Sequence, residues 1–188
     1  MILASSSPRR KVLLGLLVDS FDVVAPEVDE SMDPPYDRAL EAVALRKNRA
    51  VTGDVVLSAD TIGLLDGTLL QKPRSKAEAQ VMWHHMNGHS HEVRTAICVN
   101  GKVASVSTKV HMRVPASVAR QYIEDGKWEG KAGGYGIQDP ELAPHITIEG
   151  SWSNVVGLPL EATRELLEAA GIPCRAITDQ QAMDQNPF

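Results

Sequence analysis

Short apolar runs alternate with helix patterns along most of the chain, and this alternation constrains the fold more than any other feature. Residues 2–4 and 55–59 have the composition of buried strands, and helix patterns occupy about residues 8–17 and 36–51. Because each sheet face must be covered by another layer, alternating strands and helices favour a layered α/β structure. At 188 residues the chain has a common size for one domain, and we expect a single domain over residues 1–188.

Capping and turn residues mark where these elements begin and end. Ser7 and Pro8 suit the N-cap and first position of a helix that runs to about residue 17. Ser75 and Glu78 predict a capping box for a helix that ends near Gly88. The remaining expected elements are a strand at 21–24, a helix at 116–125, a glycine-rich loop at 131–136, a short strand at 145–149, a last helix at 159–170 and a loosely ordered polar tail at about 179–188.

Two dipeptides predict tight turns. Asp66-Gly67 suits a tight turn after the central strand, and Asn100-Gly101 is the strongest short hairpin signal in the chain. The stretch from residue 91 to 114 around Asn100 is rich in β-branched residues. We therefore expect two long antiparallel strands there.

The composition disfavours several classes of protein. A formal net charge of −5 disfavours a surface that binds nucleic acid or anionic membranes, because both are negatively charged and bind surfaces rich in Lys and Arg. No apolar run approaches the roughly 20 residues of a membrane span, and the N-terminus lacks the apolar region of a secretory signal. Cys98 and Cys174 lie far apart without metal-ligand spacing. We expect a cytoplasmic protein with two free thiols, no nucleic-acid partner and no membrane partner.

The first candidate site is the turn between the first strand and the first helix, Ser5-Ser6-Ser7-Pro8-Arg9-Arg10. Free backbone N–H groups and the helix dipole make a helix N-terminus attractive to anions. Arg9 and Arg10 in the first turn oppose that dipole, so an external anion would supply the missing negative charge. The alternative is a well-capped helix with solvated arginines.

Asp60 and Thr61 form the second candidate site, because they follow the apolar stretch 55–59. Polar residues at the carboxyl ends of strands in open α/β sheets commonly face the ligand crevice. We therefore expect Asp60 at the end of its strand with the Thr61 hydroxyl beside it. The alternative is an aspartate that forms a turn or caps a helix.

A third group combines scattered charges. Lys47, Lys72 and Lys131 are each, taken alone, typical of solvated surface positions, and so is the carboxylate of Glu30. Together with Asp60, however, this set offers carboxylate oxygens for a divalent metal and positive charge for a polyphosphate.

Two other kinds of site are less well supported by the sequence. His84, His85, His89 and His91 could suggest zinc, but Gly88 is expected to end the helix between His85 and His89, and no cysteine or acidic ligand has matching spacing. The chain has neither a G-x-x-x-x-G-K-[ST] loop nor a G-x-G-x-x-G turn, so the two commonest nucleotide-binding fingerprints are missing.

The motifs taken together resemble the Maf family of nucleoside triphosphate pyrophosphatases. The resemblance covers about residues 2–170 and rests on pieces in the family's order: LASSSPRR at 3–10, VDES at 28–31, the Lys47 helix, SADTI at 58–62, QKP at 71–73, NGHSHEVRT at 87–95, KAGGYGIQ at 131–138 and IEGSWSNVVGLPL at 148–160.

The resemblance implies a fold, a reaction and a set of site residues. It implies an elongated α/β fold of the Maf or ITPase-like type, with a twisted mixed sheet flanked by helices and an active-site cleft between two lobes. The implied reaction is hydrolysis of the bond between the α- and β-phosphates of a nucleoside triphosphate, with Mg²⁺ or Mn²⁺. The implied catalytic residues are Asp60, Glu30, Lys72 and Lys47, with Asp60 and Glu30 on the metal, and the implied substrate-binding residues are Ser5, Arg9, Arg10, Thr61, Lys131 and Gln138. Asp60 would orient or deprotonate the attacking water.

Finer expectations come from the same resemblance. SPRR, SADTI and KAGGYGIQ resemble the branch that acts on dTTP and UTP, in which glycines at 133, 134 and 136 would let backbone approach a ligand and Gln138 would read a pyrimidine edge. A homodimer is expected, and His91 is expected to be structural. Residues 139–145 depart from the family's usual glycine-containing segment, which leaves the path of that loop open. The competing interpretation is a nucleotide-binding regulator of cell division or septum formation without turnover.

Overall fold

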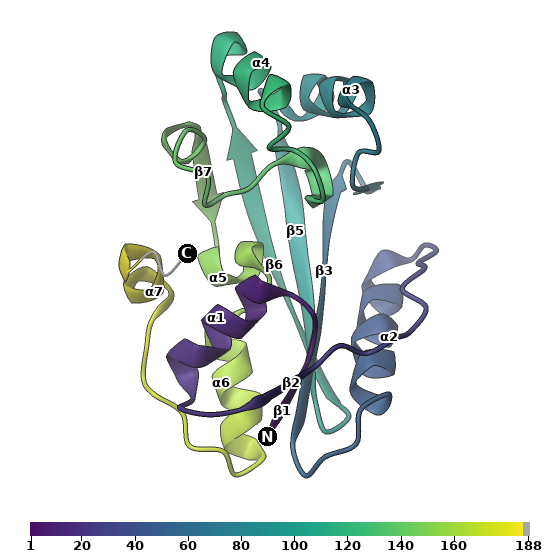
Figure 1. Cartoon of the computed structure of the whole chain (residues 1–188), viewed down its shortest axis with the longest axis vertical. Coiled ribbons are helices and arrows are strands. Elements are labelled where there is room, and N and C mark those ends of the chain that lie inside the picture. The colour runs from purple at the N-terminus through teal and green to yellow at the C-terminus, as the bar shows by residue number, and fades with distance from the viewer. Residues whose placement is uncertain (186–188) are drawn as a thin grey trace. The chain divides into compact units, whose positions relative to one another are not determined.

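The computed structural model describes residues 1–185 and contains a seven-stranded mixed sheet flanked by helices (Figure 1). The strand order is β2-β1-β3-β5-β6-β7, and β4 pairs with β3 away from this path. The α/β class and the mixed sheet expected from the sequence are therefore confirmed. No helix of the described part is long and apolar enough to cross a membrane.

The chain divides into two compact units. Unit 1 comprises Met1–Thr61, Arg94–Ser107 and the chain from Ser151 on, and unit 2 comprises Ile62–Val93 and Thr108–Gly150. Three long strands, β3 (Val56–Leu65), β5 (Ser90–Val99) and β6 (Lys102–Met112), contribute residues to both units. The expected single domain, and the expected cleft, stay predictions.

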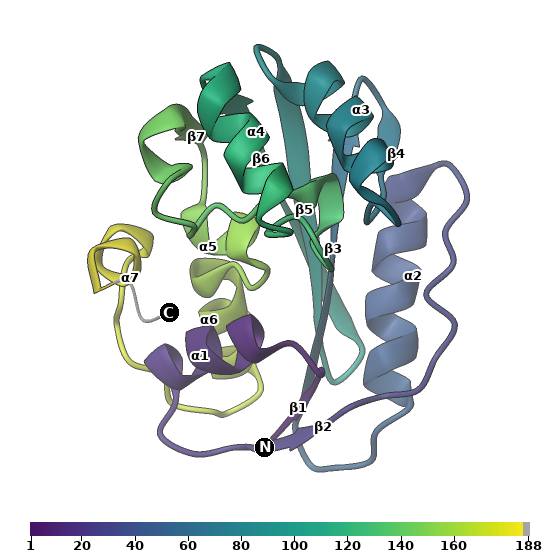
Figure 2. The same cartoon turned by 45° about the horizontal axis from the view of Figure 1, so that its top comes forward.

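Unit 1 is built on parallel strands. β1 (Ile2–Ala4) pairs in parallel with β2 (Asp22–Val24) on one side and with β3 on the other, where Ala4 lies opposite Ser58. Figures 1 and 2 show α1 (Pro8–Leu17) and α6 (Leu160–Ala169) together on one side of these strands and α2 (Tyr36–Arg49) on the other. Leu3 and Leu57 are fully buried between these layers, because parallel strands covered on both faces need apolar residues throughout.

Unit 2 is built on antiparallel pairs. β4 (Thr68–Leu70) folds back on β3, and β7 (Ile146–Glu149) pairs with β6. α3 (Lys76–Met86) contacts both α4 (Ala116–Glu124) and the short 3-10 helix η1 (Ala132–Gly134), and Figure 2 shows α3 beside α4. Met86, Met112 and Leu142 fill the core of this unit with no exposed surface.

Both dipeptide turns form as expected. Asp66 and Gly67 have φ values of 49° and 78°, and Asn100 and Gly101 have 47° and 82°. Two consecutive left-handed residues match the twist of a two-residue hairpin, which Asn or Asp followed by Gly adopts at little cost. The second turn joins β5 to β6, which are neighbours in the sheet.

The structure corrects the expected end of the central strand. β3 does not end at Asp60 but continues to Leu65, so Asp60 lies in mid-strand. The two polar side chains can be accommodated within the strand because both are hydrogen-bonded. Asp60 binds Lys47, and Thr61 binds Arg10 and Thr95. The neighbouring strand β1 does end here: its last residue, Ala4, lies opposite Ser58, two positions before Asp60. The expectation that polar residues at the carboxyl end of a strand face the ligand crevice therefore applies to β1.

Smaller differences concern caps and the C-terminal region. Ser75 caps α3 through Glu78 N, but the Glu78 carboxylate binds Arg74 instead of completing the capping box. Helix α5 (Trp152–Val156) was not predicted from the sequence. Helix α7 (Asp179–Gln185) follows α6, contacts α5 and buries Ala182. The looseness expected of the tail stays a prediction, and residues 186–188 lie outside the described part.

Candidate functional site

A buried lysine joins two carboxylates in unit 1. The Lys47 Nζ atom lies 2.6 Å from Asp60 Oδ1 and 2.8 Å from Glu30 Oε1. Lys47 and Asp60 are 5% and 7% exposed, whereas the Glu30 side chain is 57% exposed. Lysine is almost never buried unless it is paired, so this lysine is held by the two carboxylates it connects.

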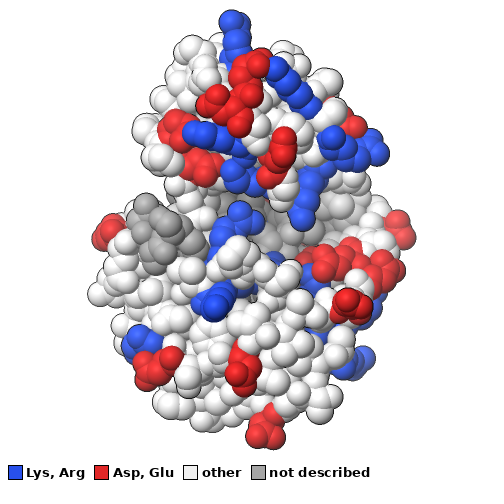
Figure 3. Space-filling model, in the orientation of Figure 1, with Lys and Arg blue, Asp and Glu red and all other residues white. Residues whose placement is uncertain are grey.

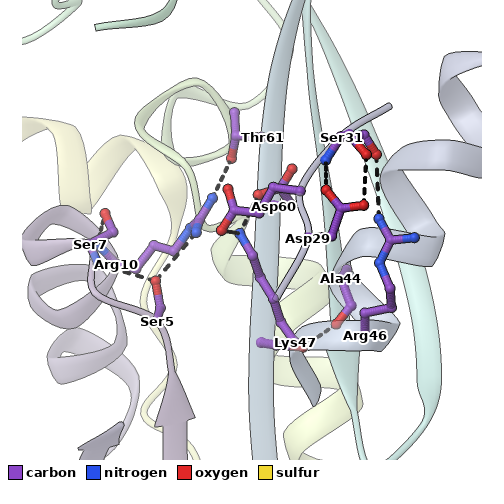
Figure 4. Close-up of polar contacts among 12 residues, drawn as sticks. Ser5, Ser7, Arg10, Asp29, Ser31, Ala44, Arg46, Lys47, Asp60 and Thr61 are labelled. Atoms are coloured by element: carbon purple, nitrogen blue, oxygen red, sulfur yellow. Dashed lines mark hydrogen bonds and ion pairs between the residues drawn. The ribbon is translucent and has the colours of Figure 1, made fainter. Parts of the chain in front are cut away.

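Helix α2 and strand β3 hold this lysine in place. Ser58 Oγ donates to the carbonyl of Ala44 over 2.7 Å, and Asn48 Nδ2 donates to the carbonyl of Val56 over 2.7 Å. These bonds flank Lys47 on α2 and fix the helix against the strand that carries Asp60. Figure 4 shows Lys47 reaching from α2 to the Asp60 carboxylate.

The Glu30 segment is held by a side-chain turn and by a second residue of α2. Asp29 accepts hydrogen bonds from the backbone N and the hydroxyl of Ser31, at 2.9 and 2.8 Å. These bonds lower the pKa of the Asp29 carboxyl. Arg46 Nη2 donates to the Ser31 carbonyl over 3.4 Å, so Arg46 and Lys47 together tie this segment to α2 (Figure 4).

The N-terminus of α1 carries the residues expected to bind an anion. Ser7 is the N-cap and accepts from Arg10 N, and Pro8 occupies the first turn, as the sequence predicted. Ser5 is buried, and its hydroxyl oxygen accepts from Ser7 N at 3.2 Å and from Arg10 Nη1 at 3.3 Å. Arg9 is exposed on the same turn.

Arg10 is fixed by a network that reaches across the strands of unit 1. Its Nε donates to the carbonyl of Gly157 over 2.9 Å, and its Nη2 donates to Thr61 Oγ1 over 3.0 Å. Thr95 Oγ1 donates to the Asn154 carbonyl, so the 2.9 Å contact between the two threonine hydroxyls is donated by Thr61. Thr61 is thus engaged with protein groups on both sides.

Sequence reasoning missed Thr95, Asn154 and Gly157. Thr95 has no exposed surface and lies on β5, where a threonine is ordinary, so no local signal marks it. Gly157 has a φ of 120°, and a Cβ there would lie 3.4 Å from Thr61 Oγ1 and 3.7 Å from Arg10 Nε. Both distances are ordinary contacts, so the positive φ and not the space beside Arg10 favours glycine at this position. Only its place in the motif GSWSNVVGLPL hinted at a role.

The partners of Arg10 are all uncharged. Ser5, Thr61 and Gly157 accept its hydrogen bonds, and Arg10 has no ion pair within the described part of the chain. Burial lowers the pKa of the Arg10 guanidinium, while the nearby Asp60 carboxylate opposes that shift. A partly buried guanidinium at a helix N-terminus, without a carboxylate bound to it, has the charge and geometry to receive an anion.

Unit 2 holds the other residues expected at the site. Lys72 is exposed, between β4 and α3, and makes no hydrogen bond or ion pair within residues 1–185. Lys131 pairs with Asp139 at 3.0 Å. Gln138 is partly buried, and its Nε2 atom is buried without a hydrogen-bond partner among the described residues. An unpaired buried donor costs free energy, so this amide is the least satisfied polar group of the loop.

The glycines of residues 133–136 make room for the protein's own atoms, which differs from the expectation that they admit a ligand. Gly133 and Gly134 have φ values of 71° and 66°, which favour glycine. A Cβ on Gly134 would lie 3.1 Å from Pro73, and one on Gly136 would lie 2.5 Å from Asp139 Oδ2. The loop after them turns through Asp139–Leu142 and η2 (Ala143–His145) into β7.

His91 and Tyr135 form a buried pair in unit 2. His91 Nε2 and the Tyr135 hydroxyl are 2.6 Å apart, and His91 Nδ1 has no hydrogen-bond partner in the described residues. Burial lowers the pKa of His91 to about 4 and raises that of Tyr135, so both groups are neutral near pH 7. A neutral pair on β5 fits the expected structural role.

The carboxylate oxygens of Asp60 and Glu30 in unit 1 suit a hard divalent cation such as Mg²⁺. Asp60 and Glu30 converge on one ammonium, so their oxygens lie within the reach of a single cation. Mg²⁺ is commonly held by one or two carboxylates together with substrate phosphates. Residues 1–185 contain no group of three or more His, Cys, Asp or Glu residues arranged for a metal. Cys98 and Cys174 are both free, as expected.

Charge of both signs is mixed over the face drawn in Figure 3, within unit 1 and within unit 2 alike. Neither unit presents a continuous basic field on that face. This agrees with the net charge of −5. On the face that Figure 3 draws, basic and acidic side chains are interspersed.

Comparison with known proteins gives a consistent result. Residues 1–170 match the family model described as Maf-like protein. The chain is 42% identical over 185 residues to a dTTP/UTP pyrophosphatase of Symbiobacterium thermophilum, with 92% of this chain and 95% of the relative covered. It is 40% identical to a protein of the same name from Anaeromyxobacter dehalogenans, with the same coverage, and 39% identical to one from Pyrococcus abyssi, with 89% and 95% covered.

Proposed function

This chain belongs to the Maf family, and we propose that it hydrolyses nucleoside triphosphates, dTTP and UTP above all, to the nucleoside monophosphate and pyrophosphate. The names of relatives about 40% identical over nearly the whole chain support the reaction and the substrate class. One structural observation carries the proposal. Lys47 brings the carboxylates of Asp60 and Glu30 together, next to an arginine that has only neutral partners.

Asp60 is the residue we assign to the attacking water. Only its Oδ1 atom is hydrogen-bonded within residues 1–185, by Lys47, which leaves Oδ2 to accept a proton from water or to orient it. The bond to Lys47 fixes the direction in which Oδ2 points. Fixed geometry is what a general base needs, since proton transfer requires hydrogen-bond reach of the reacting water.

Arg10 is the residue we assign to the triphosphate. Its guanidinium is held by three neutral acceptors and retains N–H groups for an incoming oxygen, because a guanidinium carries five donors. The N-terminus of α1, with Ser5 and exposed Arg9, adds backbone N–H groups and positive charge. Charge that builds on the leaving pyrophosphate is offset by such fixed cations.

Lys47, Lys72 and Glu30 have different parts in this proposal. Lys47 orients both carboxylates, and exposed Lys72 is available to phosphate oxygens. Lys131 is not assigned to phosphate, because its three ammonium hydrogens all have acceptors within the protein: Asp139, Tyr122 and the Lys127 carbonyl.

Asp60 and Glu30 are also the residues that would hold Mg²⁺ or Mn²⁺. When bound, such an ion would neutralise phosphate charge and lower the pKa of a bound water. Chelation with EDTA is expected to abolish turnover, and restoring Mg²⁺ is expected to recover it. Full activity in EDTA would remove both carboxylates from this role.

Gln138 is the residue we assign to the base. A side-chain amide offers one donor and one acceptor in a plane, which matches the carbonyl and N–H on the pairing edge of uracil or thymine. Its Nε2 atom lacks a hydrogen-bond partner within residues 1–185, so this donor is not committed to another group of the protein.

The proposal is tested with a panel of nucleotides. UTP, dTTP, CTP, GTP and 7-methyl-GTP are incubated with the protein and Mg²⁺ or Mn²⁺, and pyrophosphate and orthophosphate are measured separately. We expect pyrophosphate as the direct product, with the highest kcat/KM for UTP and dTTP, and loss of that preference in Gln138→Ala. Tight nucleotide binding without any release of phosphate would support the competing role, a nucleotide-binding regulator of cell division.

A further inference from the structure

One side-chain cluster in unit 2 lies directly beside Gln138. Asp139 Oδ2 accepts hydrogen bonds from Lys131 Nζ at 3.0 Å and from the Tyr122 hydroxyl. The Tyr122 hydroxyl in turn accepts from the backbone N of Gly136 at 3.1 Å and from Lys131 Nζ at 3.2 Å. Lys131, Gly136 and Asp139, at the two ends and in the middle of the segment 131–139, are therefore all hydrogen-bonded to the Tyr122 hydroxyl or through the Asp139 carboxylate.

The groups of this cluster are committed to one another. An ammonium has three donors, and those of Lys131 face Asp139, Tyr122 and the Lys127 carbonyl, the last at 2.5 Å. Burial and the Asp139 carboxylate raise the pKa of Tyr122, so its hydroxyl stays neutral and donates to Asp139. The Tyr122 ring is only 1% exposed and packs against Trp83 with ring centroids 5.1 Å apart, which fixes the position of the hydroxyl.

Gly136 completes the arrangement. A Cβ there would lie between 2.5 and 3.0 Å from the three terminal atoms of Asp139, so the absence of a side chain lets the carboxylate approach. Asp139 N also donates to the Gly136 carbonyl over 3.1 Å. Residues 136 and 139 are thus fixed on both sides of Gln138.

A fixed backbone matters for an amide that must distinguish two pyrimidines. Uracil presents a carbonyl and an N–H where cytosine presents an amino group and a ring nitrogen, and an amide turned by 180° offers the reverse pattern. An amide free to turn would accept both bases, whereas one held in a single orientation leaves a mismatched buried pair with the wrong base.

We propose that Asp139, through Tyr122 and Lys131, is a positioning residue that fixes the segment 131–139 and so lets Gln138 discriminate uracil from cytosine. This inference rests on the proposed function, in which Gln138 reads the base. Asp139 lies in the segment 139–145, which departs from the pattern of the family, so the device belongs to this chain. Lys131 then anchors the loop and does not bind phosphate.

The test uses two variants that break the cluster by different routes. Asp139→Asn removes the charge that pairs with Lys131 and keeps the shape. Tyr122→Phe removes the shared hydroxyl and keeps the ring against Trp83. Glu141→Gln is the matched control, because Glu141 pairs with Lys127 at 2.5 Å next to the cluster without binding Lys131, Tyr122 or Asp139. Gln138→Ala sets the scale for losing the base contact.

Two readouts separate the inference from the proposed function. Hydrogen exchange in the peptide that spans 131–139 is expected to rise in both variants and not in Glu141→Gln. The ratio of kcat/KM for UTP to that for CTP is expected to fall roughly fivefold in both, through KM more than kcat, and to approach the ratio of Gln138→Ala.

Unchanged exchange and an unchanged ratio in both variants, with the ratio lost in Gln138→Ala, would overturn the inference and leave the proposed function intact. An unchanged ratio in Gln138→Ala would overturn the base contact and with it the inference. A wild-type protein that hydrolyses neither nucleotide would contradict the proposed function itself, and the selectivity part of the inference with it.

Discussion

Asp60 and Thr61 are neighbours on β3, yet their side chains take part in two different hydrogen-bond networks. Successive side chains of a strand point to opposite faces, so Asp60 meets Lys47 from α2 while Thr61 meets Arg10 from α1 (Figure 4). The sequence indicated both residues but placed the two polar groups side by side. Adjacent positions of β3 thus serve two groups: Asp60 belongs with the carboxylates that Lys47 joins, and Thr61 holds the arginine that we assign to phosphate.

The first residue-scale prediction concerns Asp60. Asp60→Asn keeps a group that can accept from Lys47 but cannot take a proton from water, so kcat is expected to fall about 10²- to 10⁴-fold. Asp54→Asn is the control, since that exposed carboxylate makes no hydrogen bond or ion pair within residues 1–185. Steady-state kinetics on UTP, with circular dichroism to verify folding, check this. Retention of more than about a tenth of kcat, a loss below ~1.4 kcal/mol, would remove Asp60 from the role.

The second concerns Thr95, which touches Arg10 only through Thr61. Thr95→Val removes the acceptor of the Thr61 hydroxyl hydrogen, so Thr61 and Arg10 lose their fixed orientation, and KM for UTP is expected to rise roughly tenfold. Thr95→Ser keeps the hydroxyl and is expected to retain most of the affinity. Equal KM values for the valine and serine variants would show that the network does not position Arg10.

The third concerns the low pKa of His91. The unfolded chain binds a proton near pH 6.5 whereas the folded protein does so only near pH 4, so unfolding takes up a proton between these values. The stability that His91 contributes is therefore complete above pH 6.5 and is lost as the pH falls toward 4, by up to about 3 kcal/mol. Urea unfolding at several pH values checks this. The loss should be smaller in His91→Gln, and an identical pH dependence in that variant would refute the assignment.

At the scale of helices and strands, the bounds set by local chemistry could be predicted and those set by tertiary partners could not. Ser7-Pro8, Asp66-Gly67 and Asn100-Gly101 form the cap and turns that the sequence indicated. The continuation of β3 through Asp60 depends on Lys47, a residue 13 positions away on another element. Nothing in the sequence near Asp60 records that partner, so the strand was expected to end there.

The same distinction holds for the site. Asp60, Glu30, Lys47, Ser5 and Arg10 could be named from motifs, and the structure brings them together in unit 1. The cluster of Tyr122, Lys131 and Asp139 could not be named, because its members matter only through a shared hydroxyl. Hydrogen bonds between residues far apart in the chain leave no local pattern in the sequence from which they could be predicted.

The prediction at this scale concerns the cap of α1. Ser7→Ala removes the side-chain acceptor of Arg10 N and is expected to lower the free energy of unfolding by about 1 kcal/mol. Ser6→Ala, at an exposed position that caps nothing in the described part of the chain, is the matched control. Denaturant unfolding of both variants measures the difference. Equal stabilities would show that backbone and solvent alone satisfy the start of the helix.

At the scale of the whole molecule, we predict a homodimer, because a strand at the edge of the sheet can pair with a second copy of the chain. β2 ends the strand order on one side, and its Val23 and Val24 are 43% and 41% exposed. Light scattering at micromolar concentration measures the mass directly. A mass near 20.4 kDa would contradict the dimer without affecting the catalytic assignment.

The central claim is that the bond between the α- and β-phosphates is the one hydrolysed. Phosphorus NMR of UTP incubated with the protein and Mg²⁺ identifies both products in one sample. The account predicts uridine monophosphate and pyrophosphate in equal amounts, with neither formed by Asp60→Asn at the same concentration. Uridine diphosphate with orthophosphate as the first products, or UTP left intact by the wild-type protein, would contradict it.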